Sequence, residues 1–91
     1  MRIISGRLKG RNIKIPKNLT IRPTTDKARE GLFNILENRF DIEDIKVLDL
    51  FSGSGSISYE FISRGCSDII AVDNNHSCIK HIQQMRENLN I

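Results

Sequence analysis

Apolar and polar positions follow helical spacing in some parts of the chain and form short apolar runs in others. Helical spacing predicts a helix over residues 25–40, with an apolar side made of Ala28, Leu32, Phe33, Ile35, Leu36 and Phe40. Apolar runs at 46–51 and 68–73 predict two buried strands, followed by helices over 56–64 and from 74 or 75 to about 88. Because crossover helices connect parallel strands, this order predicts the start of a doubly wound α/β sheet.

The first 23 residues have a different pattern. Residues 11–15 alternate apolar and polar positions, as a half-buried strand does, and residues 2–5 are also β-prone. Gly6 and Gly10 lie between these two stretches, so we expect a β-hairpin. Two prolines bound residues 16–23, which predicts a loop.

Composition restricts the class of protein. The 91 residues are 38% hydrophobic and 27% charged, which is typical of a folded globular domain. No apolar run approaches the roughly 18–20 residues of a membrane span, and the first residues lack the apolar core of a secretory signal. With only two cysteines, Cys66 and Cys78, a cytoplasmic location is expected.

Charge is distributed unevenly. Residues 1–30 hold nine basic and two acidic residues, a net charge of +7, whereas residues 31–91 carry −4. A basic segment on an acidic body indicates a polyanionic partner, although a solvated basic surface gives the same pattern. Since the segment has no aromatic residue, phosphate contacts are a better expectation than base stacking. The candidate RNA-binding residues are Arg2, Arg7, Lys9, Arg11, Lys14 and Arg22.

A glycine turn follows the first apolar run. The strand ends near Asp49, the turn contains Gly53 and Gly55, and a helix follows at once. Glycine permits a tight turn and close approach of a ligand to the backbone. Asp73, eighteen residues after Gly55, ends the next strand, where its carboxylate can accept hydrogen bonds from two ribose hydroxyls. Together these features predict a nucleoside site.

Other glycine-turn motifs do not match. Ser58 stands where a dinucleotide fingerprint has its third glycine, which disfavours a nicotinamide-dependent oxidoreductase. Ser56 replaces the P-loop lysine, and Ser52 replaces the first glycine of a nucleophile elbow. The remaining pattern is similar to that of S-adenosylmethionine-dependent methyltransferases. Two structural alternatives stay open: Asp49 as a hydrogen-bond acceptor within the fold and Asp73 as a helix cap.

Longer segments carry a more specific resemblance. Residues 22–36, RPTTDKAREGLFNIL, resemble the RPT…D…RE.LFN.L signature of bacterial 16S ribosomal RNA guanine-N2 methyltransferases. Residues 3–11 resemble the opening hairpin of that family, and residues 47–55 resemble its cofactor motif. The resemblance implies a Rossmann-like class I methyltransferase that acts on the exocyclic amine of one guanine in small-subunit rRNA.

The resemblance also implies roles for individual residues. Asp49, Gly53 and Gly55 would hold the methionine part of S-adenosylmethionine, Asp73 its ribose, and Asn74 would lie beside the adenine. The full set of implied cofactor-binding residues is Asp49, Phe51, Ser52, Gly53, Ser54, Gly55, Asp73 and Asn74. The basic hairpin and Arg22 would lie against RNA. For Arg29, an orienting role and a surface ion pair are equally open.

The family's acceptor motif, Asp/Asn-Pro-Pro-Tyr/Phe, is not found, because Pro16 and Pro23 are the only prolines and are not adjacent. We therefore expect the N-terminal portion of a longer, monomeric enzyme. In this division, residues 1–23 face RNA and residues 24–91 begin the cofactor-binding domain. The chain alone is expected to be inactive and to bind cofactor weakly. A non-catalytic RNA-binding module is the alternative.

Smaller features favour packing over chemistry. Cys78 and His81 lie one helical turn apart, with His76 and Cys66 nearby in sequence, but a structural zinc site needs four ligands in paired spacings. Buried thiols and surface histidines are expected instead. Four phenylalanines have the spacing of core residues: Phe33, Phe40, Phe51 and Phe61. Tyr59 is expected at a partly exposed helix position.

Overall fold

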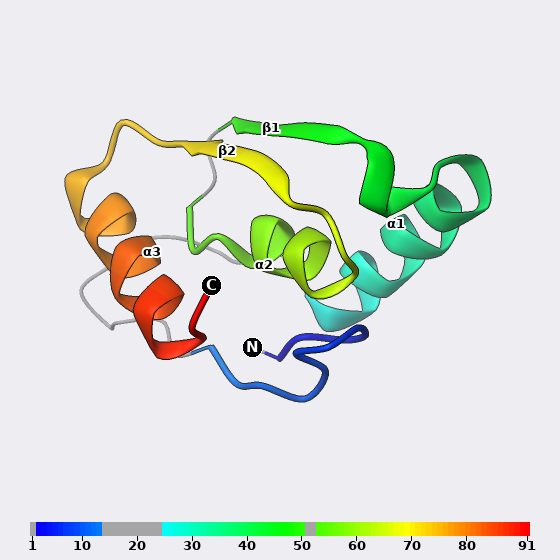
Figure 1. Ribbon diagram of the computed structural model, residues 1–91. Helices are drawn as coiled ribbons and strands as arrows, with labels where there is room; N and C mark the ends of the chain where they lie inside the picture. The colour runs from blue at the N-terminus through cyan, green and yellow to red at the C-terminus, as the bar shows by residue number, and fades with distance from the viewer. Residues whose placement is uncertain (1, 14–24, 51–52) are drawn as a thin grey trace.

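The computed structural model describes residues 2–13, 25–50 and 53–91 (Figure 1). Its elements in chain order are α1 (Asp26–Arg39), a 3₁₀ helix (Ile42–Asp44), β1 (Lys46–Leu50), α2 (Ser56–Ser63), β2 (Asp68–Val72) and α3 (His76–Asn88). This order confirms the predicted helices and strands to within one or two residues. Within the described ranges, no helix has the length and apolar character needed to cross a membrane.

Side chains and glycines define the ends of the helices. Thr25 is the N-cap of α1, and its Oγ1 accepts a hydrogen bond from the backbone N–H of Ala28 at 3.1 Å. Asn75 caps α3 in the same way, accepting from the N–H groups of Ser77 and Cys78. After α2, Gly65 adopts a φ of 110°, a left-handed conformation that ends the helix without a Cβ clash. The sequence offers Thr24 or Thr25 as the cap of α1 and Asn74 or Asn75 as the cap of α3, and the structure shows Thr25 and Asn75 in these positions.

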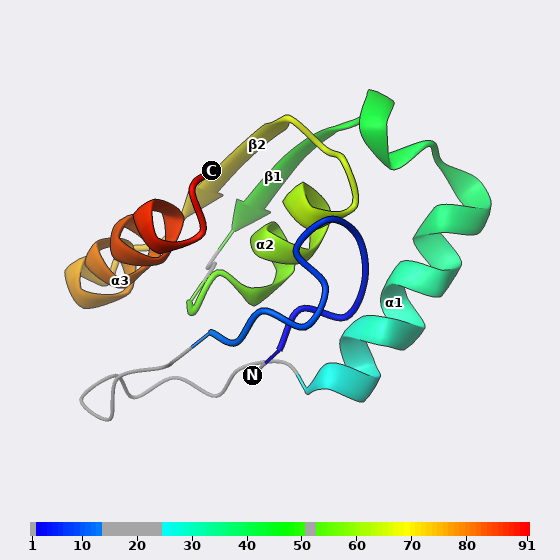
Figure 2. The same ribbon diagram turned by 60° about the horizontal axis from the view of Figure 1, so that its bottom comes forward.

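The two strands form a parallel sheet in register from Lys46 opposite Asp68 to Leu50 opposite Val72. All three helices lie on one side of this sheet, with α2 between α1 and α3 (Figures 1 and 2). The crossover through α2 is the one expected between parallel strands. This arrangement brings the glycine turn before α2 and the end of β2 to the same edge of the sheet.

The sheet face turned away from the helices is open. Leu48 and Leu50 are 61% and 59% exposed, and their neighbours on β2, Ile70 and Val72, are 62% and 44% exposed. The prediction that both strands are buried is therefore wrong: this face is exposed, and the face toward the helices is only half-buried. The reason is the pleat: alternate side chains point to opposite faces, and the described helices cover only one of them.

The core has two parts, one on either side of α2. The first joins the N-terminal segment to α2 and α3, and contains Ile3, Leu8, Ile13, Tyr59, Met85 and Leu89. The second lies between α1 and α2, and contains Phe33, Ile42, Phe61 and Cys66. The rings of Phe33 and Phe61 meet edge to face, with centroids 4.6 Å apart. Core positions for these two phenylalanines are confirmed.

Two aromatic predictions are wrong. Tyr59 is only 2% exposed, because the N-terminal segment packs over the face of α2 that carries it. Phe40 is 50% exposed, because α1 ends at Arg39 and Phe40 is its extended C-cap residue. Phe51 lies outside the described residues.

The predicted hairpin is only partly correct. Arg2 and Asn12 form one antiparallel bridge, and the N–H of Ile3 donates to the carbonyl of Arg11 at 3.0 Å. Residues 5–10 turn instead of continuing two strands, because the buried side chains of this segment pack onto α2 and α3. We call residues 2–13 the N-terminal loop. Lys14, Ile15 and the predicted loop over 16–23 lie outside the described residues.

Candidate functional site

The glycine turn leads from β1 into α2. Gly53 and Gly55 have φ angles of 57° and 82°, the left-handed region that favours glycine. A Cβ on Gly55 would lie 2.9 Å from Cζ of Tyr59 and 3.1 Å from Cγ1 of Ile82. Both the backbone conformation and the close packing therefore require glycine at this position. The first N–H groups of α2 have no partners within the helix, and Gly55 has no side chain to cap them.

Asp73 lies directly beside this turn. Its Oδ2 accepts from the N–H of Gly53 and its Oδ1 from the N–H of Asn75, each at 2.9 Å. A carboxylate has about four acceptor positions, so two bonds leave capacity for two hydroxyl groups. The carboxylate is thus held in place, partly exposed, and suited to a ribose diol. The alternative that Asp73 is the cap of α3 is wrong, because Asn75 is the N-cap of that helix.

Asp49 is held by a different contact. The hydroxyl of Ser58, which is 4% exposed, donates to Oδ2 of Asp49 at 2.7 Å. Asp49 therefore has the structural role that the sequence left open. One bond uses only part of its acceptor capacity, so this role is compatible with ligand binding. Ser58 occupies the position of the missing third glycine and replaces it with a hydrogen-bond donor.

The structure brings together most of the described members of the implied cofactor site. Gly53, Gly55 and Asp73 are adjacent, and Asp49 lies at the end of β1 that leads into the turn. Ser54 is buried and Asn74 is exposed. Phe51 and Ser52 lie outside the described residues.

The described candidates for RNA binding are all on the surface. Arg2, Arg7, Lys9 and Arg11 are exposed on the N-terminal loop. The guanidinium of Arg11 also donates to the carbonyl oxygen of Asn88 at 3.2 Å, which connects the loop to the end of α3. Lys14 and Arg22 lie outside the described residues.

A buried ion-pair network lies between the N-terminal loop, α1 and α2. Glu60 is fully buried and accepts hydrogen bonds on both carboxylate oxygens. Its Oε1 accepts from the N–H of Ile4 at 2.9 Å and from Arg29 at 3.4 Å, and its Oε2 accepts from the N–H of Ser5 at 3.1 Å and from Arg64 at 2.8 Å. A buried carboxylate is stable only with such partners.

Arg29 extends the network to α1. Its side chain is fully buried, donates to the carbonyl of Arg2 at 2.9 Å and pairs with Asp26 as well as Glu60. Arg29 is therefore an orienting residue and not a surface ion pair. Sequence reasoning missed Glu60 altogether, because Arg29, Ile4 and Ser5 lie 31 or more positions away. The spacing of four residues between Glu60 and Arg64 was the one local signal of an ion pair.

The cysteines and histidines are largely structural. Cys66 and Cys78 are buried, as predicted, but the prediction of a surface position is wrong for His81, which is only 5% exposed. Burial raises the pKa of the Cys78 thiol, and the nearby Asp73 carboxylate raises it further. Burial lowers the pKa of His81. In the described ranges no three potential metal ligands come together.

Comparison with known sequences gives consistent matches. The sequence pattern of the family described as "Conserved hypothetical protein 95" matches residues 1–91. The "Putative rRNA methyltransferase YlbH" of Bacillus subtilis (strain 168) is 44% identical over 89 residues, covering 98% of this chain and 46% of that protein. The "Ribosomal RNA small subunit methyltransferase D" of Escherichia coli (strain K12) is 45% identical over 64 residues, covering 70% of this chain and 31% of that protein. The chain thus spans less than half the length of these relatives.

Solved structures show the same fold. The "Putative methyltransferase yhhF from Escherichia coli" matches 99% of this chain with a TM-score of 0.83 and 30% identity, over 47% of its own length. A hypothetical protein of Thermus thermophilus matches 100% of this chain with a TM-score of 0.87 and 25% identity, over 51% of its own length. The fold is therefore a truncated Rossmann-like methyltransferase fold, as predicted. The chain therefore belongs to the family described as conserved hypothetical protein 95, and the relatives named above are called rRNA methyltransferases.

Proposed function

We propose that this chain is the cofactor-binding portion of an enzyme that methylates the exocyclic N2 amine of a guanine in 16S rRNA, using S-adenosylmethionine. The observation that carries the proposal is the Asp73 carboxylate, held by Gly53 and Asn75 at the edge of a glycine turn. The names of the relatives support an rRNA substrate. These groups fit a nucleoside. The Asp73 carboxylate can accept hydrogen bonds from the ribose, and the backbone of the glycine turn can be approached closely by the other parts of the ligand.

Each residue of the turn has a distinct task in this proposal. Asp73 accepts hydrogen bonds from the two ribose hydroxyls, and Gly53 lets the backbone approach the ligand. Asp49, oriented by Ser58, accepts from the positively charged amino group of the methionine part. Asn74 is exposed next to Asp73 and lies beside the adenine. When bound, the cofactor supplies an electrophilic methyl group on a sulfonium.

The remaining task is to hold the guanine amine in line with that methyl group. Bringing donor and acceptor together in one orientation lowers the barrier without covalent catalysis. The basic residues of the N-terminal loop contact RNA phosphates and position the strand without reading its sequence. The target guanine must be splayed out of its helix to reach the cofactor.

Cofactor binding tests the first part of the proposal. Asp73→Asn removes the charge that holds the ribose and should weaken S-adenosylmethionine binding by about tenfold or more, as measured by equilibrium dialysis with labelled cofactor. Asp68→Asn is the matched control, since the same change is made at the exposed far end of the same strand. Equal affinities of the two variants would contradict the assignment of Asp73.

The position of methylation needs a test in cells. Deleting the gene should abolish one N2-methylguanosine in 16S rRNA, measured by mass spectrometry of the digested rRNA. The 91-residue chain alone should transfer no methyl group to naked or ribosomal RNA. RNA binding by the chain without any cofactor binding would favour the alternative, a non-catalytic RNA-binding module.

A further inference from the structure

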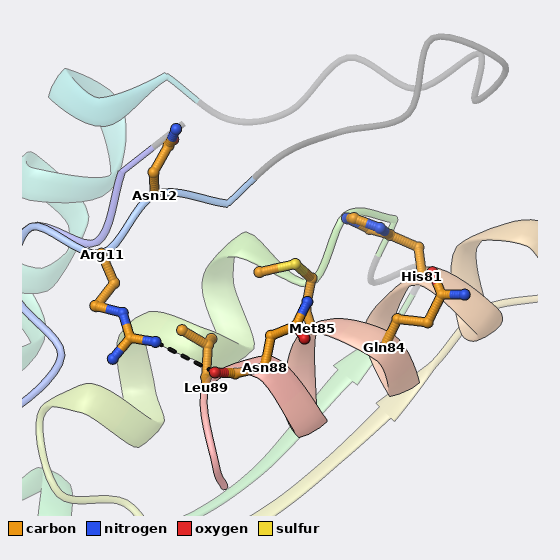
Figure 3. A pocket seen from close by; sticks show the side chains of 7 residues that line it. All are labelled: Arg11, Asn12, His81, Gln84, Met85, Asn88 and Leu89. Atoms are coloured by element: carbon orange, nitrogen blue, oxygen red, sulfur yellow. Dashed lines mark hydrogen bonds between the residues drawn. The ribbon is translucent and has the colours of Figure 1, made fainter.

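A pocket of about 420 Å³ lies between the N-terminal loop and α3 (Figure 3). It is separate from the residues of the glycine turn. Seven residues line it: Arg11, Asn12, His81, Gln84, Met85, Asn88 and Leu89. Arg11 and Asn12 come from the loop and the others from α3 and its C-cap, so the pocket spans a seam between two segments that are far apart in sequence.

The lining has the chemistry of an anion site. None of the seven residues is acidic, although the chain carries eleven acidic residues. Arg11 contributes a positive charge, and three amides, Asn12, Gln84 and Asn88, contribute further N–H donors. Met85 and Leu89 are buried and give the pocket an apolar base. A ligand with an anionic end and a less polar body suits this combination.

The side chain of His81 gives a second, independent argument for a ligand in this pocket. Its side chain is almost wholly buried, yet its Nε2 has no hydrogen-bond partner among the residues that the structure describes. The imidazole ring extends from α3 toward the side of the pocket where Asn12 lies (Figure 3). A buried polar atom without a partner is costly, and a ligand that supplies the partner removes that cost.

Arg11 is already held in place for such a ligand. One of its guanidinium nitrogens donates to the carbonyl oxygen of Asn88, at the last residue of α3 (Figure 3). A guanidinium has five N–H donors in a fixed plane. The bond to Asn88 therefore orients the group and leaves donors for an oxyanion.

We propose that this pocket binds one backbone phosphate of single-stranded RNA, with the attached ribose on the apolar base formed by Met85 and Leu89. Arg11 donates to the phosphate oxygens at one end of the pocket, where the amides of Gln84 and Asn88 complete the site. His81, about two helical turns away at the other end, bonds to the next nucleotide of the strand. The inference rests on the proposed RNA substrate and assigns it a contact point on α3, beyond the basic loop. It does not depend on the assignment of the cofactor residues.

A pair of isosteric substitutions tests the site. Gln84→Glu places a carboxylate in the pocket, and Gln83→Glu makes the same change one position earlier on α3, at an exposed residue that lines a different surface beside Glu87 and Arg86. Both variants have the same net charge. Binding of a labelled ten-nucleotide single-stranded RNA should weaken about tenfold more in Gln84→Glu than in Gln83→Glu.

Salt dependence gives a second measurement. Arg11→Gln should reduce the slope of log affinity against log salt by about 0.7, the loss of one phosphate contact to a single strand. Equal weakening by Gln84→Glu and Gln83→Glu, or an unchanged slope in Arg11→Gln, would overturn the proposed site. Circular dichroism confirms that the compared variants are folded.

Cofactor binding, measured on the same samples, separates this inference from the proposed function. If the pocket variants differ as expected while the whole enzyme does not bind S-adenosylmethionine, the proposed pocket is supported and the methyltransferase assignment is contradicted. If the cofactor binds through Asp73 while the pocket variants behave alike, the proposed function stands and this inference fails.

Discussion

At the scale of single residues, the buried Glu60 carboxylate explains more of the structure than any apolar side chain. It receives two backbone N–H groups from the N-terminal loop and two arginine side chains from α1 and from the end of α2. An apolar residue at this position would leave the N–H groups of Ile4 and Ser5 without their acceptor and would remove one acceptor from each of the two arginines. Replacing Glu60 is therefore costly even if the ion-pair network as a whole adds little net stability.

Replacing Glu60 should therefore destabilise the fold strongly. Glu60→Gln leaves Arg29 without its buried counter-charge and with only the partly exposed Asp26 as an acidic partner, and we expect a loss of about 3 kcal/mol in the free energy of unfolding, measured by urea titration. Glu37→Gln is the matched control, because Glu37 pairs with Arg64 at 2.8 Å but is 48% exposed. That variant should lose less than about 1 kcal/mol. Similar losses in the two variants would show that the burial of Glu60 has no special effect.

His81 should make stability depend on pH. Burial lowers its pKa in the folded state below the ordinary value of 6.5, so between these two values the unfolded chain binds the extra proton. The contribution of neutral His81 to stability is complete above pH 6.5 and is lost as the pH falls through that window. Unfolding measured from pH 7.5 to 5.5 should show a shallower decline for His81→Gln than for the natural chain. His76→Gln, changed at an exposed histidine, should keep the natural slope.

At the scale of elements, the sequence was sufficient to predict a helix or strand wherever its ends depend on residues close by in the chain. The helical spacing before Phe40 gave the correct extent of α1, and the adjacent polar residues that can cap α1 and α3 gave their starts to within one or two residues. The glycine turn and Asp73 were also predictable, because their spacing reflects how a strand, a turn and a helix follow one another. These features depend on neighbours in sequence.

Features that depend on distant partners could not be predicted. The N-terminal segment alternates like a strand, but its apolar residues pack against α2 and α3, so it forms a loop with one bridge. The same packing buries Tyr59, which looks like a partly exposed position when its helix is considered alone. Arg29 and Glu60 belong to different helices, and no spacing rule connects them.

The glycine turn provides a prediction at this scale. Gly55→Ala forces a Cβ into Tyr59 and a side chain into a left-handed conformation, whereas Gly10, with a φ of 83°, has open space around its Cβ position. Gly10→Ala measures the backbone cost alone, about 1–2 kcal/mol. Thermal unfolding should show a further loss of about 1–3 kcal/mol for Gly55→Ala from overpacking. Equal losses of stability in the two variants would mean that Tyr59 and Ile82 move aside to accommodate the added methyl group at no measurable cost.

At the scale of the whole molecule, α2 is the central element, with the sheet on one side and the N-terminal loop on the other (Figure 2). Besides Glu60, it contributes Ser63, whose hydroxyl accepts from the N–H of Leu8 at 3.0 Å and whose carbonyl accepts from the N–H of Arg7 at 2.9 Å. The same helix begins at the glycine turn. The glycine turn beside Asp73 therefore leads into the first residue of α2, and the N-terminal loop is hydrogen-bonded to its last residue, Ser63.

Hydrogen exchange tests whether this connection is rigid. Ser63→Ala leaves the buried N–H of Leu8 without an acceptor, so its amide should exchange at least about tenfold faster, as measured by NMR. The amide of Phe61, inside α2, should change less. Ser67→Ala is the control, because Ser67 is exposed beyond the end of the helix. If Leu8 exchanges equally fast in both variants, the loop opens independently of α2.

The attachment of the N-terminal loop also determines which other residues must accompany it when it is transferred to another protein. Its backbone N–H groups and the carbonyl of Arg2 are satisfied by the side chains of Glu60 and Arg29, which belong to the domain beneath it. A chimera that receives residues 2–13 alone would bury polar groups without partners. Exchanging this loop between related proteins therefore requires the transfer of three separate sequence segments together: the loop itself and the parts of α1 and α2 that carry Arg29 and Glu60.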